Sequence, residues 1–498
     1  MDVEQLKEDV REGKVKLDRL VELIGSLQRK LTEANQRIEE LEAKLGKSPT
    51  DKLDQPFSVK AEEKRQEARG RKAKRKKTKT PRRGRLKTAD KLKLAEREEA
   101  VFPDGVDPAQ CQFSHSRPVW RLEEGRSVLV AYHIYRGPGN RYGKIPGTLG
   151  RSEFGLEIIV AIAYQVFIVG LSFDKVCLLM NFFQNLRLRK SQADALLNQL
   201  ARHWQSEFDR LCVLLANSAV VHADETGWSI NSVWAFLSEK VRVLFFGVHK
   251  DAETLKQILD PEKFVGIVIS DDAAVYANFT QSQKCWAHLL RKAIKLTLLE
   301  PDHAEYRRLA DRLLEIYRAA CRVQSDRRLG AAGRARKVAE LDDEVLELCA
   351  PVWRAELPPS DGPDNDYRLL CNELMRLMLA EQLFTFVTAA AVEMPDGLVV
   401  PVSGTNNESE RALRDAAMAR KTGRTNKTPR GARRQTVLTS VLESLRLQLS
   451  CFTLSSVIEE IERWSTRGRS CFEDLMRKLR LRPSDTSTLD ALLPLPSD

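Results

Sequence analysis

Three acidic residues in this sequence occur where carboxylates could hold metal ions. Asp224 ends the apolar segment SAVVHAD, Asp271 ends the apolar segment FVGIVISD, and Glu410 lies in TNNESERALR, which begins as a helix with Asn or Thr as its cap. A carboxylate at the end of a buried strand is costly unless something pairs with it, and a metal ion is the usual partner. Three hard oxygen ligands suit two Mg²⁺ or Mn²⁺ ions, which can activate a water or a 3′-hydroxyl and stabilise the leaving oxygen of a phosphodiester. Taken singly, each residue is better explained as a surface cap or a salt bridge.

Two strands and a helix would have to bring these carboxylates together. Between Asp224 and Asp271, the segments SVWAFLS and VRVLFFGVH predict a hairpin. If the two apolar strands are neighbours in one sheet, both carboxylates lie at its edge, as on the first and fourth strands of a ribonuclease-H-like sheet. A helix packed across that sheet can deliver Glu410. The stretch from Asp271 to Glu410 is far longer than a strand-to-helix connection needs, so residues 285–400 are predicted to form an inserted, mostly helical domain.

Three neighbouring carboxylates are alternatives to the chosen ones. Glu225, Asp272 and Glu408 each lie one or two positions away from a member of the set. By the two-residue period of a strand, Asp272 points to the opposite side from Asp271. By helix geometry, Glu408 lies about 200° round the helix from Glu410. Geometry therefore points Asp272 and Glu408 away from the predicted metal ions.

The overall charge favours an anionic partner. Of 498 residues, 81 are Lys or Arg and 70 are Asp or Glu, a net charge of +11, and such an excess favours nucleic acid before membrane. The run ARGRKAKRKKTKTPRRGRLK cannot bury a core, so it is predicted to be disordered alone and to neutralise phosphates without reading bases; a solubilising linker is the alternative. A second basic cluster, RKTGRTNKTPRGARR, favours the DNA interpretation. The candidate DNA-contacting residues are Arg71, Lys74, Arg75, Lys76, Lys77, Arg82, Arg83, Arg414, Lys421, Arg424 and Lys427.

Residues beside the acidic set leave further alternatives open. Arg414 shares a helix face with Glu410, where it could hold a DNA phosphate or simply form an ion pair with Glu410. Trp286 and His288 in CWAHLLRKA could contact substrate, although a Trp on a helix is more often part of the core. For Asn406 and Asn407, capping of their helix is the alternative to a role at the site.

The sequence predicts neither a membrane protein nor an oxidising compartment. The nine cysteines include no CxxC pair, which indicates reduced thiols, and the first residues, MDVEQLKEDV, are charged from the start, unlike a secretory signal. The apolar segment 156–171 is too short and too closely flanked by charge for a membrane span of ~20 residues, and a buried helix is predicted instead. We therefore expect a cytoplasmic protein.

The N-terminal segment has a heptad pattern. Apolar residues recur every seven positions along one seam and fill most of a second, and charged residues occupy the remaining positions. An apolar repeat that averages 3.5 residues over several heptads predicts a coiled coil, and with it a homodimer or higher oligomer. A single amphipathic helix packed on its own protein is the alternative. The first seam contains Val10, Leu17, Ile24, Leu31, Ile38 and Leu45, and the second contains Leu6, Leu20, Leu27 and Leu41.

At these motifs the sequence resembles the transposases of the insertion-sequence 66 family. The matching blocks are HADETGW, VISDDAAVY, CWAHLLRKA and TNNESERALR, followed by GRTNKTPRGA, and the heptads and basic strip are also similar. The resemblance implies a ribonuclease-H-like core with an Asp-Asp-Glu triad at Asp224, Asp271 and Glu410. It further implies two bound Mg²⁺ or Mn²⁺ ions, cleavage of transposon ends at their 3′ side, and strand transfer into target DNA. It implies a bacterial protein associated with the nucleoid, and accessory proteins of the element are possible partners.

One difference from the family and two alternative functions stay open. Family members usually carry a cysteine-rich zinc module before the core, whereas this region has only Cys111, with His115 and His133 nearby. We expect a metal-free remnant of that module, or a Cys/His site completed from elsewhere in the chain. A catalytically inactive, DNA-binding relic and a plain nuclease without transfer activity are the alternative functions.

The expected fold class is α/β, a ribonuclease-H-like core with a large helical insertion, preceded by helical and small strand-rich regions and a coiled coil. The expected segments are the coiled coil (1–46), a basic disordered linker or DNA-binding arm (47–98), a small strand-rich module (99–150), a helical DNA-binding region (151–218), the first part of the core (219–284), the helical insertion (285–400), the second part of the core (401–470) and a C-terminal tail (471–498).

Overall fold

A computed structural model describes residues 86–353, 362–484 and 486–494, without the side chains of residues 465–467. The chain divides into two units, Met1–Ala73 and Lys74–Asp498, and every described residue belongs to the second. The predicted coiled coil and most of the basic strip therefore lie outside the described residues. Within the described residues, no helix combines the length and the apolar composition needed to cross a membrane.

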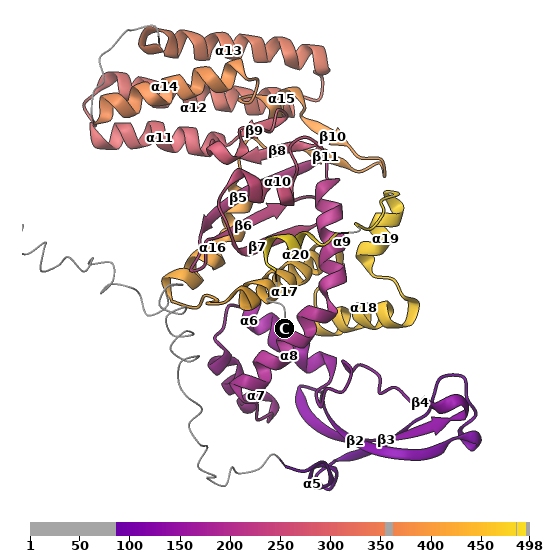
Figure 1. Ribbon diagram of the computed structural model, residues 1–498. Coiled ribbons are helices and arrows are strands. Elements are labelled where there is room, and N and C mark those ends of the chain that lie inside the picture. The colour runs from indigo at the N-terminus through magenta and orange to yellow at the C-terminus, as the bar shows by residue number, and fades with distance from the viewer. Residues whose placement is uncertain (1–85, 354–361, 485, 495–498) are drawn as a thin grey trace, which may run out of the picture. The chain divides into compact units, whose positions relative to one another are not determined.

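A small sheet forms the first described module (Figure 1). Strand β3 lies between β1 and β2, parallel to β1 and antiparallel to β2, and β4 pairs with its end. The β2–β3 turn uses Glu124 and Gly125 at φ 47° and 80°, the left-handed conformation that a tight hairpin needs. The elements are α5 (Thr88–Leu92), β1 (Arg97–Val101), β2 (Gln112–Glu123), β3 (Arg126–Gly137) and β4 (Arg141–Tyr142).

This module begins earlier than composition predicted. The linker expected to end at residue 98 already contains α5 and the first residues of β1. Specific pairing holds this charged stretch: Arg97 pairs with Glu123 at 2.8 Å and Arg126 with Glu96 at 2.7 Å, so the start of β1 is tied to both strands of the hairpin. Composition cannot reveal such cross-strand pairs, because it averages over a window of neighbours.

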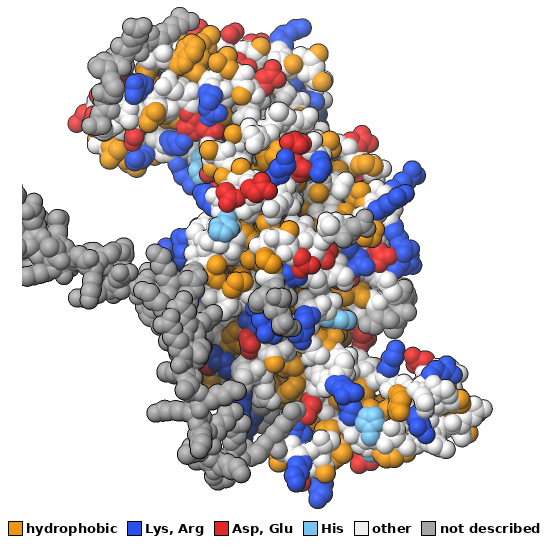
Figure 2. Space-filling model, viewed as in Figure 1, with side chains coloured by type: hydrophobic (Ala, Val, Ile, Leu, Met, Phe, Trp, Pro, Cys, Tyr) orange, Lys and Arg blue, Asp and Glu red, His pale blue; other side chains and the backbone are white. Residues whose placement is uncertain are grey.

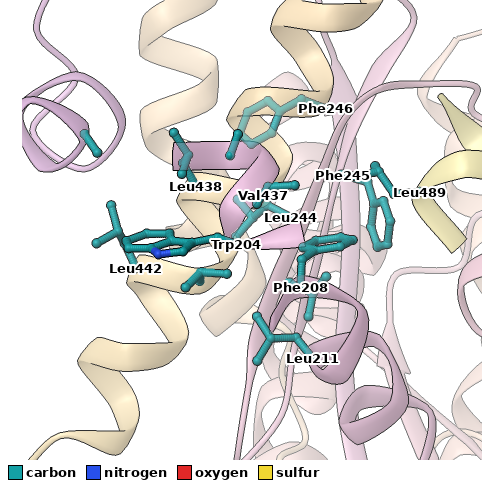
Figure 3. Packing of buried hydrophobic residues seen from close by; sticks show 14 of the residues in the cluster. Trp204, Phe208, Leu211, Leu244, Phe245, Phe246, Val437, Leu438, Leu442 and Leu489 are labelled. Carbon is teal, nitrogen blue, oxygen red and sulfur yellow. The ribbon is translucent and has the colours of Figure 1, made fainter. Parts of the chain in front are cut away.

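Four helices follow and lead into the central sheet. The predicted buried helix is α6, in which seven of the first eight residues are buried. Trp204, between α8 and α9, is fully buried, and Phe208 of α9 packs edge-on against Phe245 with ring centroids 5.5 Å apart (Figure 3). The helices are α6 (Leu156–Phe167), α7 (Phe173–Gln184), α8 (Lys190–His203) and α9 (Gln205–Ala216).

The central sheet has the strand order β7-β6-β5-β8-β9. Strand β6 runs antiparallel to both β5 and β7, and β6 and β7 form the predicted hairpin. Strands β8 and β9 run parallel to β5. All six residues of β6 are buried, as expected for a central strand covered on both faces. The elements are β5 (Val220–Gly227), β6 (Ser232–Leu237), β7 (Arg242–Val248), α10 (Ala252–Ile258), β8 (Ile267–Ser270) and β9 (Ser282–Lys284).

The segment predicted as an insertion contains long helices with their own apolar core (Figure 1). That core includes Leu313, Val345 and Leu374 from three different helices, and it reaches Ile269 of β8. A short hairpin returns the chain to the sheet. The elements are α11 (Trp286–Leu299), α12 (Ala304–Ser325), α13 (Ala331–Trp353), α14 (Pro363–Leu379), α15 (Thr385–Thr388), β10 (Ala391–Glu393) and β11 (Val399–Pro401).

The last helices complete the core. Helix α17 packs along β7, and its Val437 and Leu438 lie in the same cluster as Phe245 (Figure 3). The expected C-terminal tail is wrong as a description, because Phe472 and Leu489 are fully buried in that cluster. The elements are α16 (Asn407–Lys421), α17 (Pro429–Gln448), α18 (Leu454–Arg467), α19 (Cys471–Lys478) and α20 (Thr488–Leu492).

Candidate active site

Neighbouring strands bring Asp224 and Asp271 to the same level of the sheet. The parallel pairing of β5 with β8 ends at His222 opposite Ile269, and the two aspartates each lie two residues further along. Asp224 is inside β5 rather than at its end, which corrects the sequence-based expectation. Strand β5 continues because it still pairs with β6, where Asp224 lies opposite Ala235. Strand β8 stops at Ser270, so beside Asp224 the sheet is open on one side.

Buried contacts fix the bend that follows β8. Lys284 of β9 is almost fully buried and donates from Nζ to Ser270 Oγ at 3.1 Å and to the Asp271 carbonyl at 3.2 Å. The backbone N–H of Ala273 donates to the Asp271 carboxylate at 3.1 Å. These bonds hold Asp271 where the strand turns away. Sequence reasoning missed Lys284, since an isolated lysine carries no signal.

Asn406 ties the start of α16 to β5. Its Nδ2 donates to the Ala223 carbonyl at 2.8 Å, its Oδ1 lies 3.2 Å from His222 Nδ1, and its backbone N–H donates to Cys285 Sγ at 3.1 Å. Its side chain makes no capping hydrogen bond to the helix. The expectation of a simple cap is therefore wrong: this fully buried amide sets the position of α16, and with it Glu410 one turn later.

Carboxylates converge on Asp224. Burial first, and then the negative charges of Glu225, Asp271 and Glu410, together raise the pKa of Asp224 to about 7, although the N–H of Glu225 donates to its carboxylate and opposes the shift. The three predicted residues are thus close enough to interact electrostatically. Lys250 is a cation beside this cluster, and the pKa of its amine is raised by Glu225 and also by Asp271 and Asp224.

Helix α11 supplies two groups that contact Glu410. Arg291 pairs with Glu410 Oε1 at 2.5 Å, and His288 Nδ1 lies 3.6 Å from the same oxygen. Arg291 was not predicted, although its spacing of three residues from His288 places both on one helix face. Arg414 is exposed and forms no ion pair with Glu410. The fully buried Trp286 belongs to the core, where its indole N–H donates to the Leu383 carbonyl at 2.7 Å.

The alternative carboxylates are engaged elsewhere. Glu225 has 1% of its side chain exposed and is held by the Tyr276 hydroxyl and by Lys250 Nζ at 2.7 Å. Asp272 forms an ion pair with Arg376 of α14. Glu408 is half-exposed and lies 3.9 Å from His222 Nε2 and 3.7 Å from an Arg242 nitrogen.

The candidate DNA-contacting residues fall into two groups. Those from Arg71 to Arg83 lie outside the described residues, whereas Arg414 and Lys421 are exposed on α16. Arg424 bonds the Gly170 carbonyl and Thr422, and Lys427 Nζ donates to Thr425 at 2.5 Å. Arg424 and Lys427 line a cavity of about 750 Å³, whose walls also include α6–α7 residues and the start of α17.

The strand module does not assemble its Cys and His residues into one cluster. His133 Nδ1 lies 2.7 Å from Ser116 Oγ, and its Nε2 lies 3.1 Å from Glu98. Neither Cys111 nor His115 belongs to a described group of three or more metal-ligating side chains.

Comparison with known proteins identifies the family. A search of curated proteins found no match. The family model described as "Transposase IS66 family" matches residues 151–434, more than half of the chain. That region contains Asp224, Asp271 and Glu410 together with the α11 residues that contact Glu410, and the match confirms the resemblance carried by the sequence blocks. The protein belongs to the IS66 family of transposases.

Proposed function

We propose that this transposase cleaves transposon-end DNA and transfers the resulting 3′ strand into target DNA, using Asp224, Asp271 and Glu410 as its catalytic carboxylates. The proposal rests on the position of the three carboxylates. Asp224 and Asp271 lie side by side on neighbouring strands, each two residues beyond the last β5–β8 pair, and the negative charge of Glu410 contributes to the raised pKa of Asp224. Family membership indicates DNA as the substrate class, and the geometry of the site indicates which carboxylates act on it.

The donor set fits hard divalent cations. Carboxylate oxygens are what Mg²⁺ and Mn²⁺ prefer, and burial together with repulsion from neighbouring carboxylates raises the pKa of Asp224 to about 7. A cation of charge two at this place would relieve that repulsion. We propose that Asp224, Asp271 and Glu410 together hold two such ions.

The bound ions would supply Lewis-acid activation of the attacking water or 3′-hydroxyl and stabilisation of the leaving oxygen. The chain itself does the positioning. Lys284 and the N–H of Ala273 hold Asp271, and Asn406 fixes the helix that presents Glu410. Tyr276 and Lys250 occupy Glu225, which keeps this extra carboxylate away from the ions.

The sheet supports a ribonuclease-H-like core. Three antiparallel strands, β5, β6 and β7, are followed by two strands parallel to β5, in the order β7-β6-β5-β8-β9. This arrangement agrees with the relation between first and fourth strands expected from the sequence. We infer that α11–α15 form an insertion within this core. We further propose that residues 1–46 form a dimeric coiled coil and that the basic strip binds DNA without sequence preference.

Loss of any one carboxylate tests the catalytic assignment. Asp224→Asn, Asp271→Asn and Glu410→Gln should each reduce cleavage of DNA carrying the element's terminal repeats by more than about 100-fold in Mg²⁺ or Mn²⁺. Loss of groups that only support metal ligands already costs 10–100-fold, so loss of a ligand should cost more. DNA binding, measured by gel shift, should persist in all three variants.

Glu408→Gln and Asp272→Asn are the controls, and both should retain most of the activity. Glu408 shares α16 with Glu410 but faces His222 and Arg242, and Asp272 pairs with Arg376. If a control abolishes cleavage while its neighbour is dispensable, the site assignment is wrong. If all three triad variants cut DNA, the proposed Asp-Asp-Glu chemistry fails. If the parent binds DNA and cuts none, the proposed activity fails, and an inactive relic is favoured.

A further inference from the structure

One Cys, one His and one Glu meet beside the proposed magnesium site. Cys285 precedes α11, His288 lies in its first turn, and Glu410 comes from the first turn of α16. The Sγ, ring-nitrogen and carboxylate atoms of these residues all lie within 4.8 Å of one another. Among the described residues, this is the one group of three or more such side chains that could hold a metal ion.

The spacing approaches that of ligands around one small ion. Two ligands that each lie about 2.1 Å from a tetrahedral ion are about 3.4 Å apart. His288 Nδ1 and Glu410 Oε1 are separated by 3.6 Å. The ligand atoms of the full set lie within 4.8 Å of one another. Since Zn–S bonds measure only about 2.3 Å, the longest of these distances would have to shorten by up to about 1 Å when a metal ion binds.

The Nδ1 atom of His288, 3.6 Å from Glu410 Oε1, provides a second observation. This nitrogen is buried and has no hydrogen-bond partner, although burial of a nitrogen without a partner costs free energy. Cys285 is also buried, and its sulfur, which accepts a hydrogen bond from the Asn406 N–H, lies within 4.8 Å of the ligand atoms of His288 and Glu410. A metal ion would satisfy both atoms.

The donors determine which metal fits. Imidazole nitrogen and thiolate sulfur favour zinc and similar transition metals, whereas Mg²⁺ prefers oxygen alone. We propose that Cys285, His288 and Glu410 form a zinc-type site, distinct in its ligands from the carboxylate site and sharing only Glu410 with it. Three protein ligands leave a fourth position open, and the thiol of Cys285 releases its proton to solvent when the ion binds.

Arg291 has to release Glu410 Oε1 before a metal ion can bind to this site. It pairs with that oxygen at 2.5 Å, but its side chain is 54% exposed, so it can turn into solvent. Because Glu410 cannot serve both sites fully, zinc should inhibit magnesium-dependent cleavage. This consequence rests on the proposed function, whereas zinc binding itself does not.

Cobalt spectroscopy tests the site without using activity. The full-length protein, freed of metal with a chelator, is titrated with Co²⁺, which adopts zinc sites and gives a near-ultraviolet charge-transfer band only when a thiolate binds it. We expect this band to saturate near one equivalent and to disappear on addition of Zn²⁺. Cys285→Ser should abolish the band, and His288→Ala should weaken Co²⁺ affinity by at least about 100-fold.

Cys451→Ser is the matched control, since Cys451 is an exposed thiol outside the cluster, and it should keep the band. The proposal is overturned if the parent shows no thiolate band or if the band survives in Cys285→Ser. Asp224→Asn separates the two hypotheses, because it should lose DNA cleavage and keep the cobalt band. Cleavage by Asp224→Asn would overturn the catalytic proposal and leave the zinc-type site standing.

Discussion

Asp224 has an environment that a lone surface carboxylate never has. Burial withdraws it from water, and the negative charges of Glu225, Asp271 and Glu410 act in the same direction, so the pKa of Asp224 rises to about 7. The ordinary value for this side chain is 3.8. At a pH between 3.8 and about 7, the Asp224 carboxyl is mostly protonated in the folded protein and mostly ionised in the unfolded chain.

This difference in pKa predicts that Asp224→Asn stabilises the metal-free protein by an amount that depends on pH. A carboxyl whose folded-state pKa is raised contributes less to stability as pH rises from about 4 through 7. We therefore expect the variant to be more stable than the parent at pH 8 and to lose most of that advantage by pH 5. Urea unfolding in a chelator at several pH values measures it.

Glu408→Gln provides the reference for that experiment, since it removes a half-exposed carboxylate from α16, and surface changes of this kind usually stay within about 0.5 kcal/mol. Addition of Mg²⁺ should stabilise the parent more than Asp224→Asn, because an ion that binds only the folded state shifts the equilibrium toward it. A stability difference that does not vary with pH would contradict the charge-cluster explanation.

At the scale of elements, α17 supplies hydrogen-bond partners for the edge strand of the central sheet. Strand β7 is the last in its sheet, and its outward N–H groups need partners. Thr436, Ser440 and Ser444, spaced four residues apart on α17, accept hydrogen bonds from three of them. The distances are 3.0, 2.9 and 3.0 Å. A ladder of helix hydroxyls thus takes the place of a further strand.

Ser440→Ala should destabilise the protein by about 1–3 kcal/mol, the cost of leaving buried polar groups unsatisfied. The Ser440 hydroxyl accepts from the Leu244 N–H and also donates to the Leu244 carbonyl at 3.2 Å, so one atom serves two groups. Chemical unfolding measures the loss. The exposed Ser455 of α18 gives a matched Ser→Ala control, and equal effects at the two positions would refute the ladder's role.

At the scale of the whole molecule, positive charge is unevenly distributed along the chain. The net charge is +11, and the run from residue 64 to residue 85 is dense in Lys and Arg. On the face drawn in Figure 2, the helical insertion and the strand module carry Lys and Arg interspersed with Asp and Glu. The strip is therefore the strongest candidate for salt-sensitive contact with phosphates.

Deletion of residues 64–85 should weaken binding to all DNA sequences alike. It should also flatten the dependence of affinity on salt, by roughly 0.9 in the log–log slope for each phosphate that the strip neutralises in the parent. Fluorescence anisotropy with random duplexes over a range of salt concentrations measures both. The deletion stops before Lys87, whose carbonyl accepts from the Asp90 N–H at the start of α5. Unchanged affinity at every salt concentration would rule the strip out.

The heptads predict an oligomer whose stability depends on apolar seam positions. Ile24→Asp together with Leu31→Asp would bury charge in the seam at a cost of several kcal/mol and should convert the dimer to monomer. Sedimentation equilibrium measures the mass of each form. Glu39→Asp changes a residue outside both seams and should keep the parent's mass. An unchanged mass in the double variant would remove the coiled coil from consideration.

The sequence by itself determined the triad candidates, the hairpin between them and the family. Each of these depends on local pattern: an apolar run that ends in Asp, an alternation typical of strands, and short blocks such as TNNESERALR. Local pattern also predicted the buried helix α6, because an apolar run too short to cross a membrane has to be buried in the protein.

Only the tertiary structure decided what meets the triad. That Arg291 rather than Arg414 pairs with Glu410, that Asn406 ties α16 to β5, and that Asp224 continues within its strand all depend on contacts between segments far apart in sequence. The buried positions of Phe472 and Leu489 have the same origin. A residue's own neighbours specify its local conformation, whereas packing selects its partners, because burial and pairing are properties of surfaces that exist only after the elements assemble.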